Sequence, residues 1–553
     1  MITKEILNFC IKKGLLIDNE VLSLFKDTED IETVKLIIEK IKESPKKRIL
    51  TKEIFYENKS KVREFLLSSS KGNSKLEKLR IKLGLSIEIS RQKAEILDNS
   101  PKSQMKRELE VLDGKASFNQ HTREETGKPP DMEDSSSVKI LSMPSSFGKK
   151  IEVKDFVTHF RGRFSEMRNS LQEHSELNNL ISINKISGNR QGISVIGMVY
   201  NKKITKNKNI MLEVEDLTGR IKVLINQNKQ EVYKKAEDIV LDSVMGIKGS
   251  GNRDIIFANN VFFPESFLFE RKKSPVEEIA LFISDIHIGS NLFLEKNFLK
   301  FIDYLNGKIP NTPETDKIKY LFVVGDMIAG VGCYPNQERD LKIVDLEEQY
   351  SRAAELFGKI RKNIKIIMLP GNHDCVRLME PQPILDERYA WPLYNLRNIT
   401  LTTNPSLVNI GAKKNFPGFN VLAYHGFSFP YYAQNVPSLI KEKAINSPDK
   451  VMAYLLKNKH LAPTYASVQS APSEKDSLMI REAPDIFVSG HTHKNGVSYY
   501  NNTLVISNSC WEDLMPYQEK MGFESDYCKV PMFNLKTREV KILDFYDLSD
   551  EED

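Results

Sequence analysis

Three features of the sequence predict a multidomain α+β protein. Apolar residues recur every three or four positions near the start, as they do in helices. Short stretches with alternating apolar residues fill the middle, as in the strands of a β-barrel. In the C-terminal half, apolar stretches of strand length run directly into polar residues. At 553 residues the chain is long enough for three or four domains. We expect a small helical module, an OB-fold barrel and a larger α/β domain, in that order.

The composition is typical of a globular protein that works in water. Hydrophobic residues make up 40% and charged residues 28% of the chain, so a sizeable core can form. The net charge of +5 favours no partner class. The five cysteines form no Cys-x-x-Cys pair, which indicates free thiols in a reducing compartment. No apolar run approaches the ~20 residues of a membrane span, and the first residues do not resemble a signal peptide. We therefore expect a cytoplasmic protein without a membrane partner.

Residues 1–70 predict the helical module. Ile6 and Cys10 recur at helical spacing, as do Val34 and Ile38. These stripes are consistent with a small core or with a module that docks on another protein, and the sequence does not choose between the two.

Residues 71–150 predict a flexible linker, because they combine low hydrophobicity with many Ser, Pro and charged residues. Residues 151–177 predict a connecting helix. Its apolar stripe contains Phe156, Phe160 and Phe164, and Arg163 is expected elsewhere on its surface.

Residues 178–270 predict the OB-fold, since three strands, a helix and two further strands is the element order of that barrel. A basic loop, residues 201–208, is expected between the first two strands. Tyr200 is the main candidate for stacking on a base, while Phe257, Phe262 and Phe263 are expected in the core. We favour a scaffold role for this domain, with independent DNA binding as the alternative.

Five apolar stretches in the C-terminal half each end in polar residues that can bind metal. Open α/β sheets place their sites at such strand ends. A lone Asp or His at a strand end is usually an ordinary loop residue, but five of the nine histidines fall in these strings. The candidate side chains are Asp285, His287, Asp326, Asn372, His373, Asp374, His425, His491 and His493.

Seven of these side chains, all except His373 and Asp374, are enough to hold two metal ions if one carboxylate bridges them. Mixed nitrogen and oxygen ligands suit Mn, Fe or Zn better than Ca. We expect two divalent cations, with Mn²⁺ first and Mg²⁺, Fe or Zn as alternatives. A metal pair about 3.5–4 Å apart is suited to cleaving a phosphoester.

The same strings resemble a known family. Asp-x-His, Gly-Asp, Gly-Asn-His-Asp, a strand-end His and Gly-His-x-His are the motifs of the calcineurin-like metallophosphoesterases. The stretches 325–338, 370–377 and 490–496 are more closely similar to the small subunits of archaeal DNA polymerase D. The catalytic resemblance covers residues 275–553 and implies a four-layer α/β/β/α phosphodiesterase domain. The middle domain also resembles the OB domain that precedes it in polymerase small subunits.

The resemblance implies a role for each candidate. Asp285, His287 and His493 match the ligands of one metal; Asn372, His425 and His491 match those of the other, and Asp326 matches the bridge. His373 matches the residue that stabilises the transition state or protonates the leaving oxygen, a task that suits an imidazole near neutral pH. Asp374 is expected to orient its ring.

The implied function is a 3′→5′ exonuclease that removes single-stranded or mismatched DNA 3′ ends and so proofreads. Synthesis would belong to a separate large subunit, because this chain shows no second acidic constellation. A sliding clamp or other replication proteins are further expected partners. Two rivals remain: a phosphatase of another substrate class on the same fold, and a non-catalytic scaffold subunit. The intact ligand set counts against the scaffold.

Overall fold

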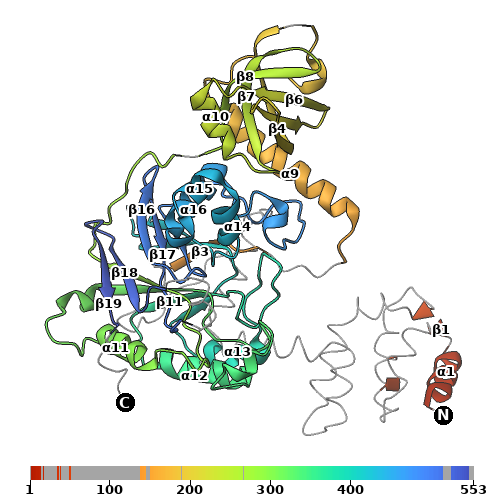
Figure 1. The fold of residues 1–553 in the computed structure, drawn as a ribbon. Coiled ribbons are helices and arrows are strands. Elements are labelled where there is room, and N and C mark those ends of the chain that lie inside the picture. Colours follow the sequence, from red (N-terminus) through yellow and green to blue (C-terminus); the bar gives the residue numbers. More distant parts are fainter. Residues whose placement is uncertain are drawn as a thin grey trace. The chain divides into compact units, whose positions relative to one another are not determined.

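The computed structural model describes residues 2–13, 16–17, 34–35, 38, 49–50, 138–144, 150–188, 190–265, 267–514 and 525–546. The chain divides into two units, Met1–Gln120 and His121–Asp553. Each unit is described by itself (Figure 1). Most of the predicted linker, residues 71–150, and the acidic residues 547–553 at the end of the sequence lie outside the described residues.

The first unit begins with helix α1 (Ile2–Lys12). Strand β1 (Leu16–Ile17) pairs in parallel with β2 (Ile49–Leu50). Ile6 and Cys10, one helical turn apart, are fully buried, and so is Val34. The expected helical spacing therefore produces a buried stripe in the part of the module that the structure describes.

The second unit opens with a strand where the sequence predicts linker. Strand β3 (Val138–Ser142) pairs antiparallel with β13 (Ser406–Ile410). Val138 packs against the core of the C-terminal domain. The linker expectation for residues 71–150 is therefore wrong at this strand. Its apolar residues are too few to stand out beside the Ser- and Pro-rich residues around them, and pairing with a distant strand stabilises it.

A closed barrel of five strands, in the order β4-β5-β6-β8-β7, forms the middle domain. Its strands alternate inward and outward; in β6, for example, Ile221, Val223 and Ile225 are buried. Helix α10 lies between β6 and β7 in the chain, and a parallel β6–β8 pairing closes the barrel. The elements are β4 (Arg190–Ile204), β5 (Ile210–Glu215), β6 (Arg220–Ile225), α10 (Gln230–Glu237), β7 (Val244–Gly251) and β8 (Ile255–Phe262), after a short 3-10 turn, η1 (Ile183–Lys185).

Two details of the barrel differ from expectation. Strand β4 extends to Ile204, because a bulge after Val199 lets it keep pairing with β5 where a loop was predicted. Phe257 is 50% exposed, whereas Phe262 and Phe263 are buried as expected. Phe257 points outward because its neighbours on β8, Ile256 and Ala258, face the barrel core.

Helix α9 (Val153–Gln172) precedes the barrel and carries an unexpected buried charge. Arg163 is 1% exposed, and its Nε donates to Oδ2 of Asp476 at 2.7 Å. His159 and His460 complete this buried cluster, with His460 Nε2 lying 2.9 Å from the same Asp476 oxygen. The prediction that Arg163 lies away from the buried face was wrong. Its partner, Asp476, lies 313 positions further along the chain, so the local sequence gives no sign of the pair.

The C-terminal domain contains two six-stranded sheets, ordered β12-β11-β10-β9-β18-β19 and β16-β17-β15-β14-β13-β3. Side chains of both sheets, such as Phe282 and Phe322 of the first and Val421 and Ile486 of the second, share one core. The further strands are β9 (Ile279–Ile283), β10 (Ile318–Val324), β11 (Lys365–Leu369), β12 (Ile399–Leu401), β14 (Phe419–Ala423), β15 (Ile486–Ser489), β16 (Gly496–Tyr500), β17 (Thr503–Ser507), β18 (Lys529–Asn534) and β19 (Val540–Asp544).

Helices cover both sheets of this domain. One group packs with the first sheet in a separate core: α11 (Glu295–Leu305), α12 (Leu346–Gly358) and α13 (Glu387–Tyr394). A second group packs with the second sheet: α14 (Phe429–Asn435), α15 (Pro437–Lys441) and α16 (Pro448–Asn458). Short 3-10 turns lie at η2 (Pro313–Lys317), η3 (Gln337–Arg339), η4 (Ala444–Asn446) and η5 (Tyr465–Ser467).

The barrel contacts this domain directly. The carbonyl of Asp238, just after α10, accepts a hydrogen bond from Tyr454 Oη at 2.7 Å, and its carboxylate accepts from the backbone N–H of Ser438. Such contacts are what a scaffold role of the barrel requires. Among the described residues, no helix combines the length and the apolar content needed to cross a membrane.

Candidate metal centre

The candidate side chains gather where strands of the two sheets end. β9, β10 and β11 are parallel neighbours, and their C-terminal ends lead into Asp285, Asp326 and Asn372. β14 and β15, also parallel, lead into His425 and His491. Because parallel strands end at the same edge of a sheet, residues up to 208 positions apart meet in one place.

The backbone turns sharply at these strand ends. Asp285, His287, Asp326, His491 and His493 all adopt positive φ, between 50° and 68°. Such conformations are uncommon for residues other than glycine and cost of order 1–3 kcal/mol each, so they persist where the surrounding structure imposes them. Their concentration at five of the seven candidate ligands makes this edge the candidate functional site.

Glycines let the strand-end loops approach one another. A Cβ atom at Gly371 would collide with the carboxylate of Asp326, and one at Gly325 would collide with the ring of His425. Bare backbone at these two positions is therefore a condition for bringing the candidate ligands together.

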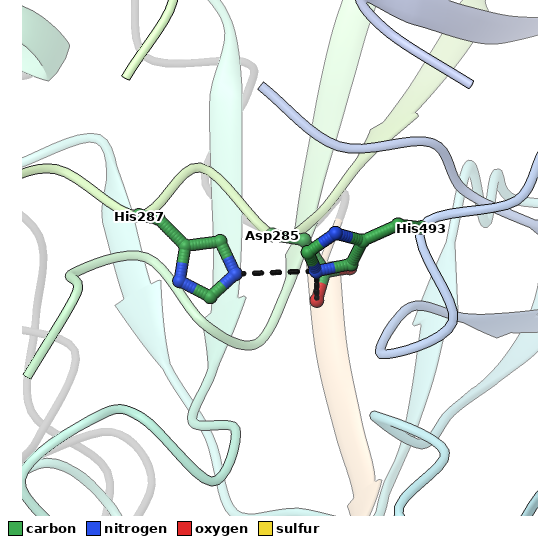
Figure 2. A group of neighbouring side chains, drawn as sticks. All are labelled: Asp285, His287 and His493. Carbon is green, nitrogen blue, oxygen red and sulfur yellow. Dashed lines mark hydrogen bonds and ion pairs between the residues drawn. The ribbon is translucent and has the colours of Figure 1, made fainter. Parts of the chain in front are cut away.

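The first donor cluster contains Asp285, His287 and His493, whose ligand atoms all lie within 4.8 Å of one another. The Nε2 atoms of the two histidines face each other at 3.3 Å, and His493 Nε2 lies 3.5 Å from Oδ1 of Asp285 (Figure 2). The Asp285 carboxylate also accepts from the backbone N–H of His491, which links this cluster to the next.

The second donor cluster contains Asp326, His425 and His491. Nε2 of His425 lies 3.2 Å from Oδ2 of Asp326 and 3.0 Å from Oδ1 of Asn372. Its Nδ1 lies 2.9 Å from the carbonyl of Val324, which fixes the ring so that Nε2 faces the other donors.

Asp326 also belongs to a third cluster, with His287 and His373. The backbone N–H of His373 donates to Oδ1 of Asp326 at 2.8 Å. Asp326 therefore shares donor clusters with histidines of both the first and the second group.

A backbone carbonyl, and not Asp374, contacts the His373 ring. Its Nδ1 lies 2.8 Å from the carbonyl oxygen of Ala329. The carboxylate of Asp374 instead accepts from the backbone N–H groups of Met327, Ile328 and Gly371. The carbonyl thus supplies the ring contact expected of Asp374, while Asp374 ties the loop after β10 to the loop after β11.

Charges in the site are strongly coupled. Burial opposes the charge on Asp326, but the rings of His425 and His373 outweigh burial and hold the pKa of this carboxyl well below its ordinary value. Against burial, Asp326 raises the pKa of His425 to about 9 and that of His373 to about 10. Burial and His425 lower the pKa of His491 to about 3. Cation binding would displace the proton favoured on His425, so it should release protons.

The donor set fits divalent cations. Each cluster combines carboxylate oxygen with imidazole nitrogen, a mixture suited to Mn, Fe or Zn. Glu512 is an addition that no motif revealed: it is 5% exposed and its Oε2 lies 3.8 Å from Nε2 of His287. It follows β17 without a recognisable spacing to the other donors, so the sequence carries no signal for it.

Comparisons with known proteins agree with this geometry. Residues 280–495 match the family model of the calcineurin-like phosphoesterases. The DNA polymerase II small subunit of Methanothermobacter thermautotrophicus is 37% identical over 398 residues, which cover 71% of this chain and 80% of that protein. The small subunit of the same name from Pyrococcus furiosus is 34% identical, over 72% of this chain and 64% of that protein.

Similarity to solved structures is weaker. A structure described as a novel archaeal phosphodiesterase is 15% identical and aligns with 48% of this chain and 98% of that chain, with a TM-score of 0.23. A score at that level supports no argument about the fold. The sequence relatives decide the family: this chain belongs to the DNA polymerase II small subunits, the small subunits of archaeal DNA polymerase D to which its motifs are similar.

Proposed function

We propose that this chain is a metal-dependent 3′→5′ exonuclease that acts on single-stranded or mismatched DNA ends. The observation that carries the proposal is the position of Asp326, which shares one donor cluster with His425 and His491 and another with His287 and His373. Two divalent cations held on either side of it would stabilise the charge that develops on a phosphodiester during cleavage.

The chain's own residues divide into two sets of ligands. Asp285, His287 and His493 would hold one cation. Asn372, His425 and His491 would hold the other, with Asp326 between the two. Mn²⁺ is the first candidate, and Mg²⁺, Fe and Zn remain alternatives.

His373 would serve as the acid. With Nδ1 held by the Ala329 carbonyl, Nε2 is the ring atom available to a substrate. Burial lowers the pKa of His373, but in the metal-free chain the nearby Asp326 raises it to about 10, which favours a protonated ring. Nε2 would pass that proton to the O3′ oxygen that leaves when the terminal nucleotide is removed. Asp374 supports the site by holding the two loops together.

The family name supports an assembly. Relatives are named as small subunits of a DNA polymerase, so we propose that this chain works beside a large subunit that carries out synthesis, and that its nuclease proofreads. A sliding clamp is a further proposed partner. The two helix groups outside the paired sheets support a four-layer phosphoesterase domain, and the five-stranded barrel supports an OB-fold.

A labelled single strand tests the proposal. DNA carrying a 5′ label should be shortened stepwise from its 3′ end in Mn²⁺, and Asp326→Asn should abolish the shortening. A phosphoserine peptide should be a poor substrate beside it. Preference for the peptide would indicate a phosphatase, and no hydrolysis of either substrate, with or without a large subunit, would indicate a scaffold.

A further inference from the structure

A cavity of about 650 Å³ opens beside the proposed acid. Its lining includes Asn372, His373, Arg377, Leu378, Tyr389 and Phe427. This volume lies within the range of cavities that hold small organic ligands. The cavity therefore offers room next to the metal centre for more than the phosphate group that is cleaved.

One side of the cavity is apolar and accessible. Leu378 is 51% exposed and Tyr389 is 38% exposed. Large apolar side chains gathered at one exposed place usually mark a binding surface, and aromatic rings are the groups on which unpaired bases stack.

Two arginines line the same cavity. Arg377 donates from Nε and Nη2 to the carbonyls of Met379 and Pro381, at 3.1 and 2.7 Å. A guanidinium has five N–H donors, so these bonds fix the group and leave donors for a phosphate. Arg388 is held by Asp386 and lies 5.8 Å from the Tyr389 ring. Because Asp386 also lines the cavity and neutralises Arg388, Arg377, whose bonds are to neutral carbonyls, is the better candidate for a phosphate.

The cavity is continuous with the metal centre. Asn372 and His373 are part of its lining. Phe427, on the same lining, has its ring centroid 5.2 Å from that of His491, a proposed ligand. A strand whose phosphate lies among the metal ligands would therefore have a neighbouring nucleotide at the cavity.

We propose that this cavity is a subsite for one or two unstacked nucleotides of single-stranded DNA next to the cleaved phosphate. Tyr389 stacks on a base and Arg377 binds a phosphate. A base that is paired and stacked in a duplex cannot enter, so the subsite accounts for a preference for unpaired ends. This inference rests on the proposed nuclease function and names the residues that select its substrate.

The test compares two tyrosines of similar exposure in the full-length chain. Tyr389→Ala should weaken binding of a phosphorothioate-protected single strand by about 5- to 100-fold, the effect typical of losing one base-stacking ring, and should raise KM more than it lowers kcat. Tyr499→Ala is the matched control. Tyr499 is 39% exposed and carries the guanidinium of Arg271 at 4.2 Å, but it lies on β16 outside the cavity lining. The control should bind and cleave like the unmodified protein.

A second readout locates the base. A strand with 2-aminopurine near its 3′ end should show quenched fluorescence when bound by the unmodified protein, and Tyr389→Ala should remove the quenching. If Tyr389→Ala binds the strand and quenches its fluorescence as well as Tyr499→Ala and the unmodified protein do, the proposed subsite is wrong. Weaker assembly of Tyr389→Ala with a large subunit, at unchanged DNA affinity, would also overturn it and would make the surface a protein contact. If the unmodified protein cleaves no DNA, the proposed function fails, a result distinct from both.

Discussion

The carboxylate of Asp326 accepts a hydrogen bond from the backbone N–H of His373 at 2.8 Å. Its other oxygen lies 3.2 Å from Nε2 of His425. One side chain thus connects the loop of the proposed acid with the second donor cluster, and its loss should affect more of the site than the loss of any other ligand.

Asp326→Ala should therefore lose both cations, whereas Asp285→Ala should mainly weaken one. Isothermal calorimetry with Mn²⁺ measures the stoichiometry. Asp303→Ala is a suitable control, because Asp303 is half-exposed and pairs with Lys308 on the surface. Retention of two tight cations by Asp326→Ala would be incompatible with a bridging carboxylate.

His373→Asn should keep both cations but lose about 10²–10⁴-fold in cleavage rate, the usual cost of removing a positioned acid. A nitrophenyl phosphodiester, whose leaving group needs little protonation, should be less affected than DNA. Elemental analysis beside rates on both substrates checks this. If the variant loses one metal equivalent, His373 is a ligand and not the acid.

Asp374→Asn should behave differently from His373→Asn. Because the Asp374 carboxylate holds the backbone of Met327, Ile328 and Gly371, its loss should disturb the loops that carry Asp326 and Asn372. We expect weaker metal affinity together with a lower rate. If calorimetry shows unchanged metal affinity while the cleavage rate falls, Asp374 would instead act by orienting the acid.

The buried cluster around Arg163 should make stability depend on pH. Burial and Arg163 lower the pKa of His460 to about 4, so its neutral form is favoured in the folded chain. Its stabilising contribution is complete above pH 6.5, the ordinary histidine value, and is lost as the pH falls from 6.5 to about 4. The free energy of unfolding should drop by about 1.4 kcal/mol per pH unit from this group inside that window.

The same cluster contains a carboxylate with a separate pH range. Despite burial, Arg163 and His460 hold the pKa of Asp476 well below its ordinary value, so the contribution of Asp476 to stability is lost only below pH 3.8.

Denaturant unfolding of the unmodified chain and of His460→Asn between pH 7 and 4 isolates the contribution of the histidine. The free energy of unfolding of the variant should fall less steeply with decreasing pH than that of the unmodified chain. Equal slopes for the two proteins would mean that His460 is protonated in the folded chain.

The stability of a truncated chain should depend on whether it keeps strand β3. A chain that begins at residue 138 keeps the pairing of Val138–Ser142 with β13, whereas one that begins at residue 151 exposes that edge. The shorter chain should unfold at a lower temperature, as differential scanning calorimetry would show. Equal unfolding temperatures would show that β3 adds nothing to the domain.

Much of the candidate site was predictable because its chemistry lies in short local strings. Asp285 and His287 directly follow an apolar strand, and Asn372 and His373 follow another, so the sequence itself marks the strand ends. The family resemblance was likewise confirmed by relatives that match about 70% of the chain.

What the sequence did not reveal depends on contacts between distant segments. Arg163 is buried because Asp476 lies beside it, and β3 exists because β13 offers an edge. The Ala329 carbonyl that orients the His373 ring is backbone, and backbone acceptors leave no residue-type signal. Hydrophobic patterning predicts which apolar faces are buried. It cannot predict the burial of a charged side chain whose partner lies far away in the sequence.

The most direct test of the central claim couples metal occupancy to cleavage. The rate of 3′ shortening of a 5′-labelled single strand should be measured while Mn²⁺ is titrated from zero to two equivalents per chain, with occupancy followed by electron paramagnetic resonance. If two cations share Asp326 and both are needed for cleavage, shortening should appear only as the second equivalent of Mn²⁺ binds. Full activity with a single bound cation, or intact DNA with both sites filled in the complete polymerase, would contradict the account.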